Sequence, residues 1–350
     1  MRIIPNVILL SVIICLAFIL YVLPFTMAGY LLQDTPLISY QAVIAAFIIA
    51  VILIIYMRTH VTAKVLSNFT YYGMGIGFTC LWIFGAAYLL ASIAPDFKRH
   101  FGIVALITSL SLVAYSLINA RRLVIRPLPI ASSKLTSETS FIFISDVHLG
   151  SNKASHLEAI IDKITGLNFD FLVIGGDLFD SSAFVPSQLA PLRQINKPVY
   201  FITGNHEYYV KNHADKLTSL ADYNITSLDN EAIAHEHINI IGISDNQPIA
   251  TQAEFAKKLI SDSAFNLLLV HQPGLWGTHP AGTDLMLSGH THNGQIFPFN
   301  YLVKLQFKAN YGHYQQGNSQ LYVSSGAGCW GPKMRLGSRN EIIHITLSQK

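Results

Sequence analysis

The stretch FIFISDVH, residues 141–148, sets an apolar run of β-branched and aromatic side chains directly before an Asp-x-His cluster. The same arrangement recurs, because the apolar runs 171–174 and 199–202 end a few residues before Asp177 and Asn205. Each run has the length and composition of a short strand. In open sheets, sites form at the carboxyl ends of the strands. The three polar clusters are therefore predicted to converge on one rim of a sheet.

Five polar clusters together supply an ordered set of hard metal ligands. They are Asp146-Val147-His148, Gly175-Gly176-Asp177, Gly204-Asn205-His206-Glu207, His271 and Gly289-His290-Thr291-His292. Carboxylates, imidazoles and an amide oxygen suit Mn²⁺, Fe or Zn²⁺, and the lack of thiolates argues against a structural zinc site. A single cluster of this kind is common by chance. Their residue types, order and placement together favour two-metal hydrolysis of a phosphoester.

Short apolar runs continue to the end of the chain and alternate with helical patterns. Strands are predicted at residues 141–144, 171–174, 199–202, 238–243, 265–270, 284–287, 321–324 and 342–347. Helices are predicted at residues 155–164, 188–195, 213–221 and 252–260. This alternation indicates a layered α/β or α+β domain.

The first 120 residues are of a different kind. Four apolar runs, at about residues 3–25, 40–57, 72–94 and 101–120, contain no charged side chain and approach the roughly 20 residues that cross a bilayer. One such run could be a buried core helix or a signal peptide, but four in succession favour membrane spans. We therefore predict an all-α transmembrane bundle of four helices at 1–120, a basic and polar linker at 121–137 and a catalytic domain at 138–350.

Basic residues orient the predicted spans by the positive-inside rule. If the N-terminus is cytoplasmic, the outside loops hold only Lys98 and Arg99. The inside segments then hold Arg2, Arg58, Lys64, Arg121, Arg122, Arg126 and Lys134. The prediction is a multi-pass inner-membrane protein with a cytoplasmic catalytic domain, although the Lys98-Arg99 pair leaves the opposite orientation open. No ionisable side chain lies well inside a span, so the spans are interpreted as an anchor among membrane lipids.

The charge balance excludes one class of partner. Residues 121–350 carry 18 basic and 18 acidic residues, so the net charge of +3 comes from the apolar part and its flanks. A neutral domain gives no reason to expect a nucleic-acid-binding surface. We predict no nucleic-acid partner and no protein partner.

The five clusters, in this order, resemble the five signatures of the calcineurin-like metallophosphoesterases. The resemblance covers about residues 141–350 and looks closest to the bacterial membrane-associated branch, similar to the transmembrane metallophosphoesterases. The run LSGHTHNGQI, residues 287–296, is typical of that branch, as is the tail from Ser325-Gly326-Ala327-Gly328 to Arg339-Asn340-Glu341-Ile342. Asn293 departs from the pattern of that branch, which often has Gly at this position, but Asn293 is not one of the predicted metal ligands.

The resemblance implies a β-sandwich flanked by helices, two divalent metal ions and a role for each ligand. Asp146, His148 and His292 would bind the first ion, Asn205, His271 and His290 the second, and Asp177 would bridge both. Mn²⁺ is the expected metal, with Fe or Zn²⁺ as alternatives. His206 resembles the family's catalytic histidine, which contacts the phosphoryl oxygen and can protonate the leaving group.

Other residues near these clusters have two readings each. Glu207 could support the ligands or be a solvated charge, and Arg335 and Arg339 could hold a substrate phosphate or form salt bridges or solvated loop charges. Trp330 and Tyr208-Tyr209 could line the pocket or pack in the core. Residues 297–307, apolar with Lys304 inside and Lys308 just beyond, could dip into the membrane interface as a lid or form an edge hairpin. His279 and His313 are read as surface histidines.

The function expected from these features is membrane-anchored hydrolysis of a phosphodiester or pyrophosphate bond. The substrate would be phosphorylated or pyrophosphate-linked, and the family resemblance makes a lipid-borne compound of the UDP-diacylglucosamine type plausible. One alternative is a general phosphodiesterase for small soluble substrates that is merely tethered. Another is an inactive membrane sensor or scaffold, but loss of activity usually removes ligands, and all seven are present.

Overall fold

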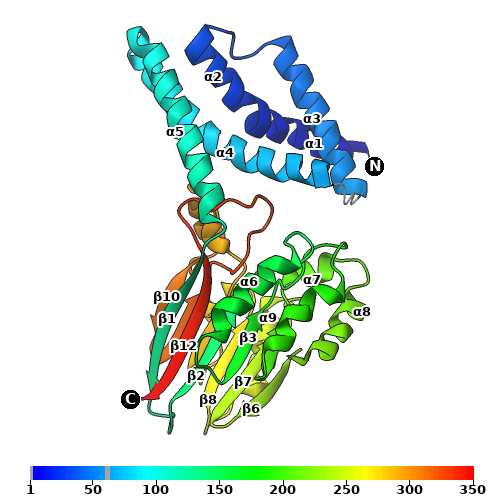
Figure 1. Ribbon diagram of the computed structural model, residues 1–350, viewed down its shortest axis with the longest axis vertical. Helices are drawn as coiled ribbons and strands as arrows, with labels where there is room; N and C mark the ends of the chain where they lie inside the picture. The colour runs from blue at the N-terminus through cyan, green and yellow to red at the C-terminus, as the bar shows by residue number, and fades with distance from the viewer. Residues whose placement is uncertain (1–2, 60–63) are drawn as a thin grey trace. The chain divides into compact units, whose positions relative to one another are not determined.

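The computed structural model describes residues 3–59 and 64–350 and divides the chain into two compact units (Figure 1). The helical unit comprises Met1–Asn119 and Gly331–Leu336, and the sheet unit comprises Ala120–Trp330 and Gly337–Lys350. Part of the predicted orientation rests on residues outside this description. They are Arg2 as a whole and the side chains of Arg58 and Lys64.

The helical unit is a series of apolar helices joined by short connections. Over the described residues these are α1 (Ile3–Ala17), a π-helical turn (Phe18–Val22), α2 (Leu23–Gln33), α3 (Tyr40–Thr59), α4 (Lys64–Ile93), a 3₁₀ turn (Pro95–Phe97) and α5 (Lys98–Asn119). The first three follow one another without a break in the chain, and Pro24 lies in the first turn of α2.

Three helices in the described part of the chain are long and apolar enough to cross a membrane. They run over Leu9–Gln33, Val65–Ile93 and Pro95–Asn119. The predicted span at residues 40–57 corresponds to α3, whose described apolar stretch, Tyr40–Tyr56, is shorter. All four predicted runs are therefore helical, and three of them reach spanning length.

The segment Gly331–Leu336 belongs to the helical unit although it comes late in the sequence. The backbone N–H of Arg335 donates to the Ser116 carbonyl at 3.0 Å, and the Asn119 side chain donates to the Arg335 carbonyl at 2.9 Å. Both α5 residues are buried. The second bond explains why the last apolar run ends in an asparagine, since a buried polar side chain needs a partner.

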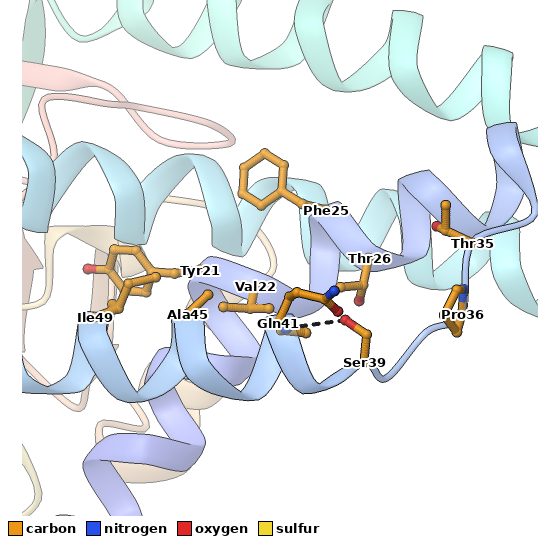
Figure 2. A pocket seen from close by; sticks show the side chains of 11 residues that line it. Tyr21, Val22, Phe25, Thr26, Thr35, Pro36, Ser39, Gln41, Ala45 and Ile49 are labelled. Atoms are coloured by element: carbon orange, nitrogen blue, oxygen red, sulfur yellow. Dashed lines mark hydrogen bonds between the residues drawn. The ribbon is translucent and has the colours of Figure 1, made fainter.

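A cavity of about 670 Å³ lies inside the helical unit, between the π-helical turn, α2 and α3 (Figure 2). Tyr21 and Phe25 line it from one side, and Gln41 and Ile49 line it from α3. Its lining is entirely within Tyr21–Ile49, so it shares no residue with the metal-ligand clusters.

The sheet unit is built on two six-stranded sheets. The first has the order β1 (Leu123–Ser132), β12 (Asn340–Gln349), β2 (Thr139–Ile144), β3 (Phe171–Gly175), β4 (Val199–Ile202) and β5 (Ile225–Ser227). The second has the order β10 (Gly312–Gln316), β11 (Ser319–Val323), β9 (Leu285–Ser288), β8 (Phe265–Val270), β7 (Ile238–Ile243) and β6 (Glu231–His235). The neighbours β2, β3, β4 and β5 are parallel, as are β7, β8, β9 and β11.

The helices of the sheet unit are α6 (Ala154–Thr165), α7 (Asn205–Tyr209), α8 (His213–Thr218), α9 (Ile249–Leu259) and α10 (Phe299–Gln306), with 3₁₀ segments at Pro186–Gln194, Ser219–Tyr223, Pro273–Thr278 and His292–Gly294. Buried residues of α6 pack on the first sheet and those of α9 on the second (Figure 1). Along β2, Phe141 and Phe143 belong to the core between the sheets, whereas Ile142 and Ile144 belong to the core under α6. Successive side chains of β2 therefore enter two different cores, as expected for a strand that is buried on both faces. The predicted β-sandwich flanked by helices is confirmed.

Three sequence predictions need correction. Residues 121–137 are not a linker throughout, because they contain β1, which pairs in parallel with β12 at the edge of its sheet. Pro127 and Pro129 are tolerated there, since an edge strand leaves alternate N–H positions without a neighbour. The helix predicted at 188–195 is a 3₁₀ segment that contains Pro191. Of residues 297–307, Phe299–Gln306 form α10, so the edge-hairpin alternative is wrong.

Candidate metal centre

The predicted ligands follow the carboxyl ends of five strands from both sheets. Asp146 follows β2, Asp177 follows β3 and Asn205 follows β4, all in the first sheet. In the second sheet, His271 follows β8, and the segment from His290 to His292 follows β9. Because these strands are parallel within each sheet, their ends meet at one rim. The structure brings the distant clusters together there.

One group of ligand atoms joins Asp146, His148 and His292. Nε2 of His148 lies 3.0 Å from Nε2 of His292, which lies 3.4 Å from Oδ1 of Asp146. All three residues are buried, and one donor atom from each lies within 4.8 Å of the others. This is the set predicted for the first ion.

A second group joins Asp177, His271 and His290. Nε2 of His271 lies 3.1 Å from Oδ2 of Asp177, and the rings of His271 and His290 have centroids 5.2 Å apart. Again one donor atom from each residue lies within 4.8 Å of the others. Asn205, predicted to complete this set, has a buried Oδ1 without a hydrogen-bond partner among the described residues.

Asp177 lies between the two groups. Its Oδ2 is 3.1 Å from Nε2 of His271 and 4.0 Å from Nε2 of His148, one histidine from each group. Its Oδ1 accepts a hydrogen bond from the backbone N–H of His206 at 2.9 Å. The carboxylate is therefore held by one oxygen while the other faces both groups, as a bridging ligand would be.

The donor set fits two divalent ions. Two donors that share an ion at about 2.0–2.2 Å lie about 3–3.4 Å apart in tetrahedral or octahedral geometry. The distances of 3.0, 3.1 and 3.4 Å within the two groups fall in that range. The partnerless Asn205 Oδ1 also fits, because an unpaired buried acceptor is costly unless something binds it. Imidazole nitrogens and carboxylate oxygens suit Mn²⁺, Fe or Zn²⁺ equally.

The ligand loops have unusual backbone conformations. Five ligand residues adopt left-handed φ angles: Asp146 (56°), His148 (55°), Asp177 (52°), His290 (69°) and His292 (49°). Such conformations cost of order 1–3 kcal/mol each and persist only where surrounding contacts determine them. Here the backbone N–H of Asp146 donates to Gly176 at 3.0 Å and that of His148 donates to Asp177 at 2.9 Å. The two loops hold each other in the strained form.

Two glycines let the ligand loops approach one another. A Cβ atom on Gly204 would lie 2.2 Å from Oδ1 of Asp177, and one on Gly289 would lie 2.4 Å from Oδ2 of Asp146. Both separations are far below van der Waals contact, so a larger residue at either position would displace a ligand.

Polar groups lie behind two of the ligand histidines, on the side away from the centre. Nδ1 of His148 lies at an ion-pair distance of 3.2 Å from Oδ2 of Asp180, while its Nε2 lies 3.0 Å from Nε2 of His292. Nδ1 of His271 lies 2.8 Å from the Gly175 carbonyl. Such partners orient metal-binding imidazoles and raise their basicity. Asp180 was not predicted from the sequence, where it is only an acidic residue three positions after Asp177.

Glu207 supports the ligand loops from beneath. Its side chain is fully buried, so the reading as a solvated charge is wrong. Its two oxygens accept backbone N–H groups from Asp177 (3.0 Å), Phe179 (3.0 Å) and Gly204 (2.7 Å). Burial, and then the charge of Asp177, raises the pKa of Glu207 to about 8, although the backbone donors of Phe179 and Gly204 oppose this rise and favour the ionised form. We assign the ionised form, because both oxygens act as acceptors.

In the second group, the pKa shifts of Asp177 and His290 favour metal-binding protonation states, whereas Asp177 outweighs burial and raises the pKa of His271 well above its ordinary value. Burial alone would raise the pKa of Asp177, but His271, His206 and His148 outweigh it and hold that pKa well below its ordinary value. Burial, and then the charge on His271, lowers the pKa of His290 to about 3. Ionised carboxylates and neutral imidazoles are the forms that bind metal ions.

His206 lies at the mouth of the centre. Its Nε2 is 4.0 Å from Oδ2 of Asp177, and its side chain remains 17% exposed. The ring lies between Tyr209 (5.4 Å between centroids) and Trp330 (6.0 Å), which are 69% and 44% exposed. Burial lowers the pKa of His206, opposed in part by Asp177. Core packing is thus the wrong reading for Tyr209 and Trp330, but it suits Tyr208, which donates to Thr203 at 3.0 Å.

The two arginines predicted to contact substrate belong to different units. Arg335 is fully buried and belongs to the helical unit. Arg339 is exposed in the sheet unit, and its carbonyl accepts the Ser325 hydroxyl at 2.7 Å. Their role toward substrate stays a prediction. His313 is exposed on β10, as predicted, whereas half-buried His279 stacks on Trp276 with centroids 4.4 Å apart.

Comparisons with known proteins agree with this geometry. The family described as "Calcineurin-like phosphoesterase" matches residues 139–294. An uncharacterized metallophosphoesterase of Campylobacter jejuni is 32% identical, with 78% of each chain aligned. One from Helicobacter pylori is 37% identical over 65% of this chain and 64% of its own, so this chain spans less than two-thirds of that relative. The "Transmembrane protein with metallophosphoesterase domain" of Bos taurus is 35% identical over 59% of this chain and 52% of its own.

Proposed function

The chain belongs to the calcineurin-like metallophosphoesterase family, and we propose that it is a membrane-anchored hydrolase of phosphodiester or pyrophosphate bonds that uses two divalent ions. The observation that carries the proposal is the position of Asp177, whose Oδ2 faces His148 of one ligand group and His271 of the other. A site for a single ion would not need a carboxylate between two complete groups. Mn²⁺ is the metal we expect, on the family resemblance.

The reaction needs three contributions from the protein. Two divalent ions, held by the seven ligand residues, would supply Lewis acidity and would activate water for attack on phosphorus. Bound ions would hold the carboxylates of Asp146 and Asp177 ionised, so both residues would act as ligands rather than proton donors. His206, which is partly exposed and 4.0 Å from Asp177, would contact the phosphoryl oxygen and give a proton to the leaving oxygen as the P–O bond breaks.

We propose a substrate held in or at the membrane, for example a pyrophosphate-linked glycolipid of the UDP-diacylglucosamine type. What supports this is the helical unit, with spanning-length apolar helices in the same chain as the metal centre. Soluble phosphodiesters are the competing substrate class. The inactive sensor is disfavoured, because all seven ligand residues are present and six of them, all but Asn205, are grouped.

One experiment tests the activity and separates the substrate classes. Purified full-length protein, washed with chelator and reloaded with Mn²⁺, is given bis(p-nitrophenyl) phosphate or a pyrophosphate-linked glycolipid in mixed micelles. We expect hydrolysis of the glycolipid with a higher kcat/KM, and loss of both activities in the Asp177→Ala variant. Metal-loaded protein that hydrolyses neither substrate class would favour the sensor.

We further propose that the sheet unit is cytoplasmic. This requires an even number of spans after a cytoplasmic N-terminus, and so it requires α3 to cross the membrane with the three longer helices. The Lys98-Arg99 pair was the objection to this orientation. Within the helical unit, Lys98 forms an ion pair with Asp34. The rule counts basic residues rather than net charge, so our proposal rests on the larger number of basic residues in the inside segments.

A further inference from the structure

Helix α10 leaves its apolar side chains exposed. Tyr301, Leu302 and Leu305 are all exposed, Leu305 to 84%, and no residue of α10 is buried. Their spacing of one, three and four residues puts them on one face of the helix. Phe297, just before the helix, is also exposed, and its ring lies against Tyr301 with centroids 5.8 Å apart. We call these four side chains the apolar face of α10.

Both ends of α10 contact the loop that carries His290 and His292. At its start, a Cβ atom on Gly294 would lie 2.3 Å from the backbone of Asn300. Just after its end, the ring of Phe307 packs edge-on against the ring of His290 at 5.3 Å. The helix is thus fixed at both ends to a metal-ligand loop while its middle faces outward. Whatever binds the apolar face is held close to the metal centre.

The charge around α10 favours an anionic occupant. The chain has no acidic residue between Asp284 and Glu341, a stretch that contains all of α10. Lys304, within the helix, and Lys308, just after it, are both exposed. Exposed apolar side chains flanked by lysines, without acids, are the composition of a helix that lies in the boundary between headgroups and acyl chains.

The same acid-free stretch also supplies the segment Gly331–Leu336 to the helical unit. The next residue, Gly337, is in the sheet unit, and a Cβ atom there would lie 3.1 Å from Cβ of Phe297. Phe297, the first residue of the apolar face, therefore lies beside the point where the chain passes between the sheet unit and the helical unit, which holds the candidate membrane spans. A chain with membrane spans lies beside a bilayer, so a bilayer is the apolar surface that is available to α10.

We propose that α10 docks on the surface of an anionic lipid bilayer, with its apolar face in the headgroup boundary and Lys304 and Lys308 on lipid phosphates. Docking in this way would hold the metal centre at the membrane surface. That consequence rests on the function proposed above, whereas the docking itself requires no turnover.

The test places a fluorescent probe on α10 in the full-length protein. Leu305→Cys in a Cys15→Ser background is labelled with an environment-sensitive dye and reconstituted in nanodiscs of phosphatidylglycerol and phosphatidylcholine. The other thiols, Cys80 and Cys329, are buried and do not compete for the label. Ser263→Cys is the matched control, since it is exposed just before β8, at the opposite end of that strand from His271.

We expect lipids with spin-labelled acyl chains to quench most of the fluorescence at position 305 and little at position 263. Lys304→Glu with Lys308→Glu should lower the quenching at 305 several-fold, as should removal of phosphatidylglycerol. Equal quenching by aqueous iodide at both positions, without lipid quenching, would overturn the proposal. If the dye at position 305 were protected from iodide and this protection disappeared on dilution in detergent, the apolar face would instead bind a second copy of this chain. Neither result bears on phosphoester hydrolysis, because no turnover is measured.

Discussion

The side-chain amide of Gln295 binds both backbone polar groups of Trp330. Its Oε1 accepts the Trp330 N–H at 3.0 Å, and its Nε2 donates to the Trp330 carbonyl at 2.8 Å. Gln295 is itself held, because its N–H donates to the carbonyl of the ligand His292 at 2.9 Å. The Trp330 indole, which lies beside His206, is therefore held in position by the loop that also carries the predicted ligand His292. The amide is suited to this role, since it offers a donor and an acceptor together.

We predict that Gln295→Met, which is similar in size but lacks both polar groups, loosens the Trp330 loop. Each buried backbone group left without a partner costs about 1–3 kcal/mol, so the free energy of unfolding should fall by that order. Hydrogen exchange at the Trp330 amide should accelerate, and kcat should fall with two metal ions still bound. Gln316→Met, at an exposed position, is the control. Unchanged exchange at Trp330 would show that the two bonds do not hold the loop.

Asp177→Ala should abolish binding of both ions. Its carboxylate faces both ligand groups, so its loss weakens both sites at once, whereas loss of His292 should weaken mainly the first. Metal analysis after chelation and reloading with Mn²⁺ should give close to two ions per chain for the unaltered protein and far less for the variant. Asp262→Ala, an exposed acid, should keep both ions. One firmly bound ion with full activity in the unaltered protein would contradict the two-ion mechanism.

His206→Ala should separate chemistry from metal binding. The backbone N–H of residue 206, which holds Asp177, is retained in this variant, so two ions should remain. A positioned acid contributes about 10²–10⁴-fold, and we expect kcat to fall by that order for substrates with poor leaving groups. The loss should shrink for a p-nitrophenolate leaving group, which needs no proton. His313→Ala is the control. A wild-type rate with a poor leaving group would refute the assigned role.

Glu207→Gln should destabilise the fold locally although it conserves shape. The amide nitrogen cannot accept a hydrogen bond, so one of the three backbone donors, such as the N–H of Phe179, is left unpaired. The expected cost is about 1–3 kcal/mol of unfolding free energy. Thermal or denaturant unfolding would measure it, with Glu236→Gln, which is exposed, as the control. An unchanged midpoint would mean that the carboxylate is not needed as an acceptor.

Local sequence predicts the central strands well, because their burial on both faces produces continuous apolar runs. The runs 199–202, 238–243 and 265–270 coincide with β4, β7 and β8. It fails for β1, since Pro127 and Pro129 argue against a strand and its partner β12 lies at the other end of the domain sequence. The alternation of apolar and polar residues in 297–307 fits a hairpin or a helix, and only the tertiary contacts at both ends decide it.

The candidate site is predictable in its ligands but not in its geometry. Residue types and order are enough to single out the clusters around Asp146 and Asp177 in the sequence alone. The left-handed backbone at Asp146 and Asp177 depends on hydrogen bonds between the loops. The conformational preferences of the local sequence do not predict such bonds. Asp180 and Gln295 act through partners distant in sequence, namely His148 and Trp330. No local pattern marks either residue, so pairing of this kind appears only in the folded chain.

The orientation of the chain in the membrane rests on fewer charges than the sequence indicates. Arg126 counts as a basic residue after the last span, but in the structure its Nε lies 2.9 Å from Oε2 of the buried Glu341. That pair is neutral and belongs to the sheet unit. Of the four basic residues between α5 and β2, Arg121 and Arg122 are exposed and adjacent to the helix, whereas Arg126 and Lys134 lie further along the chain and are paired with acids of the sheet unit.

We predict that both arginines are cytoplasmic. A green fluorescent protein fused after Lys350 should fluoresce, and an alkaline phosphatase fused there should be inactive. Replacing Arg121 and Arg122 by glutamine should weaken this preference, whereas Arg126→Gln should leave it unchanged, because Arg126 is already paired with Glu341. An active alkaline phosphatase fusion in the unaltered chain would place the sheet unit outside the cytoplasm. It would imply that α3 does not cross, and it would exclude cytoplasmic nucleotide-linked substrates while leaving the metal centre assignment intact.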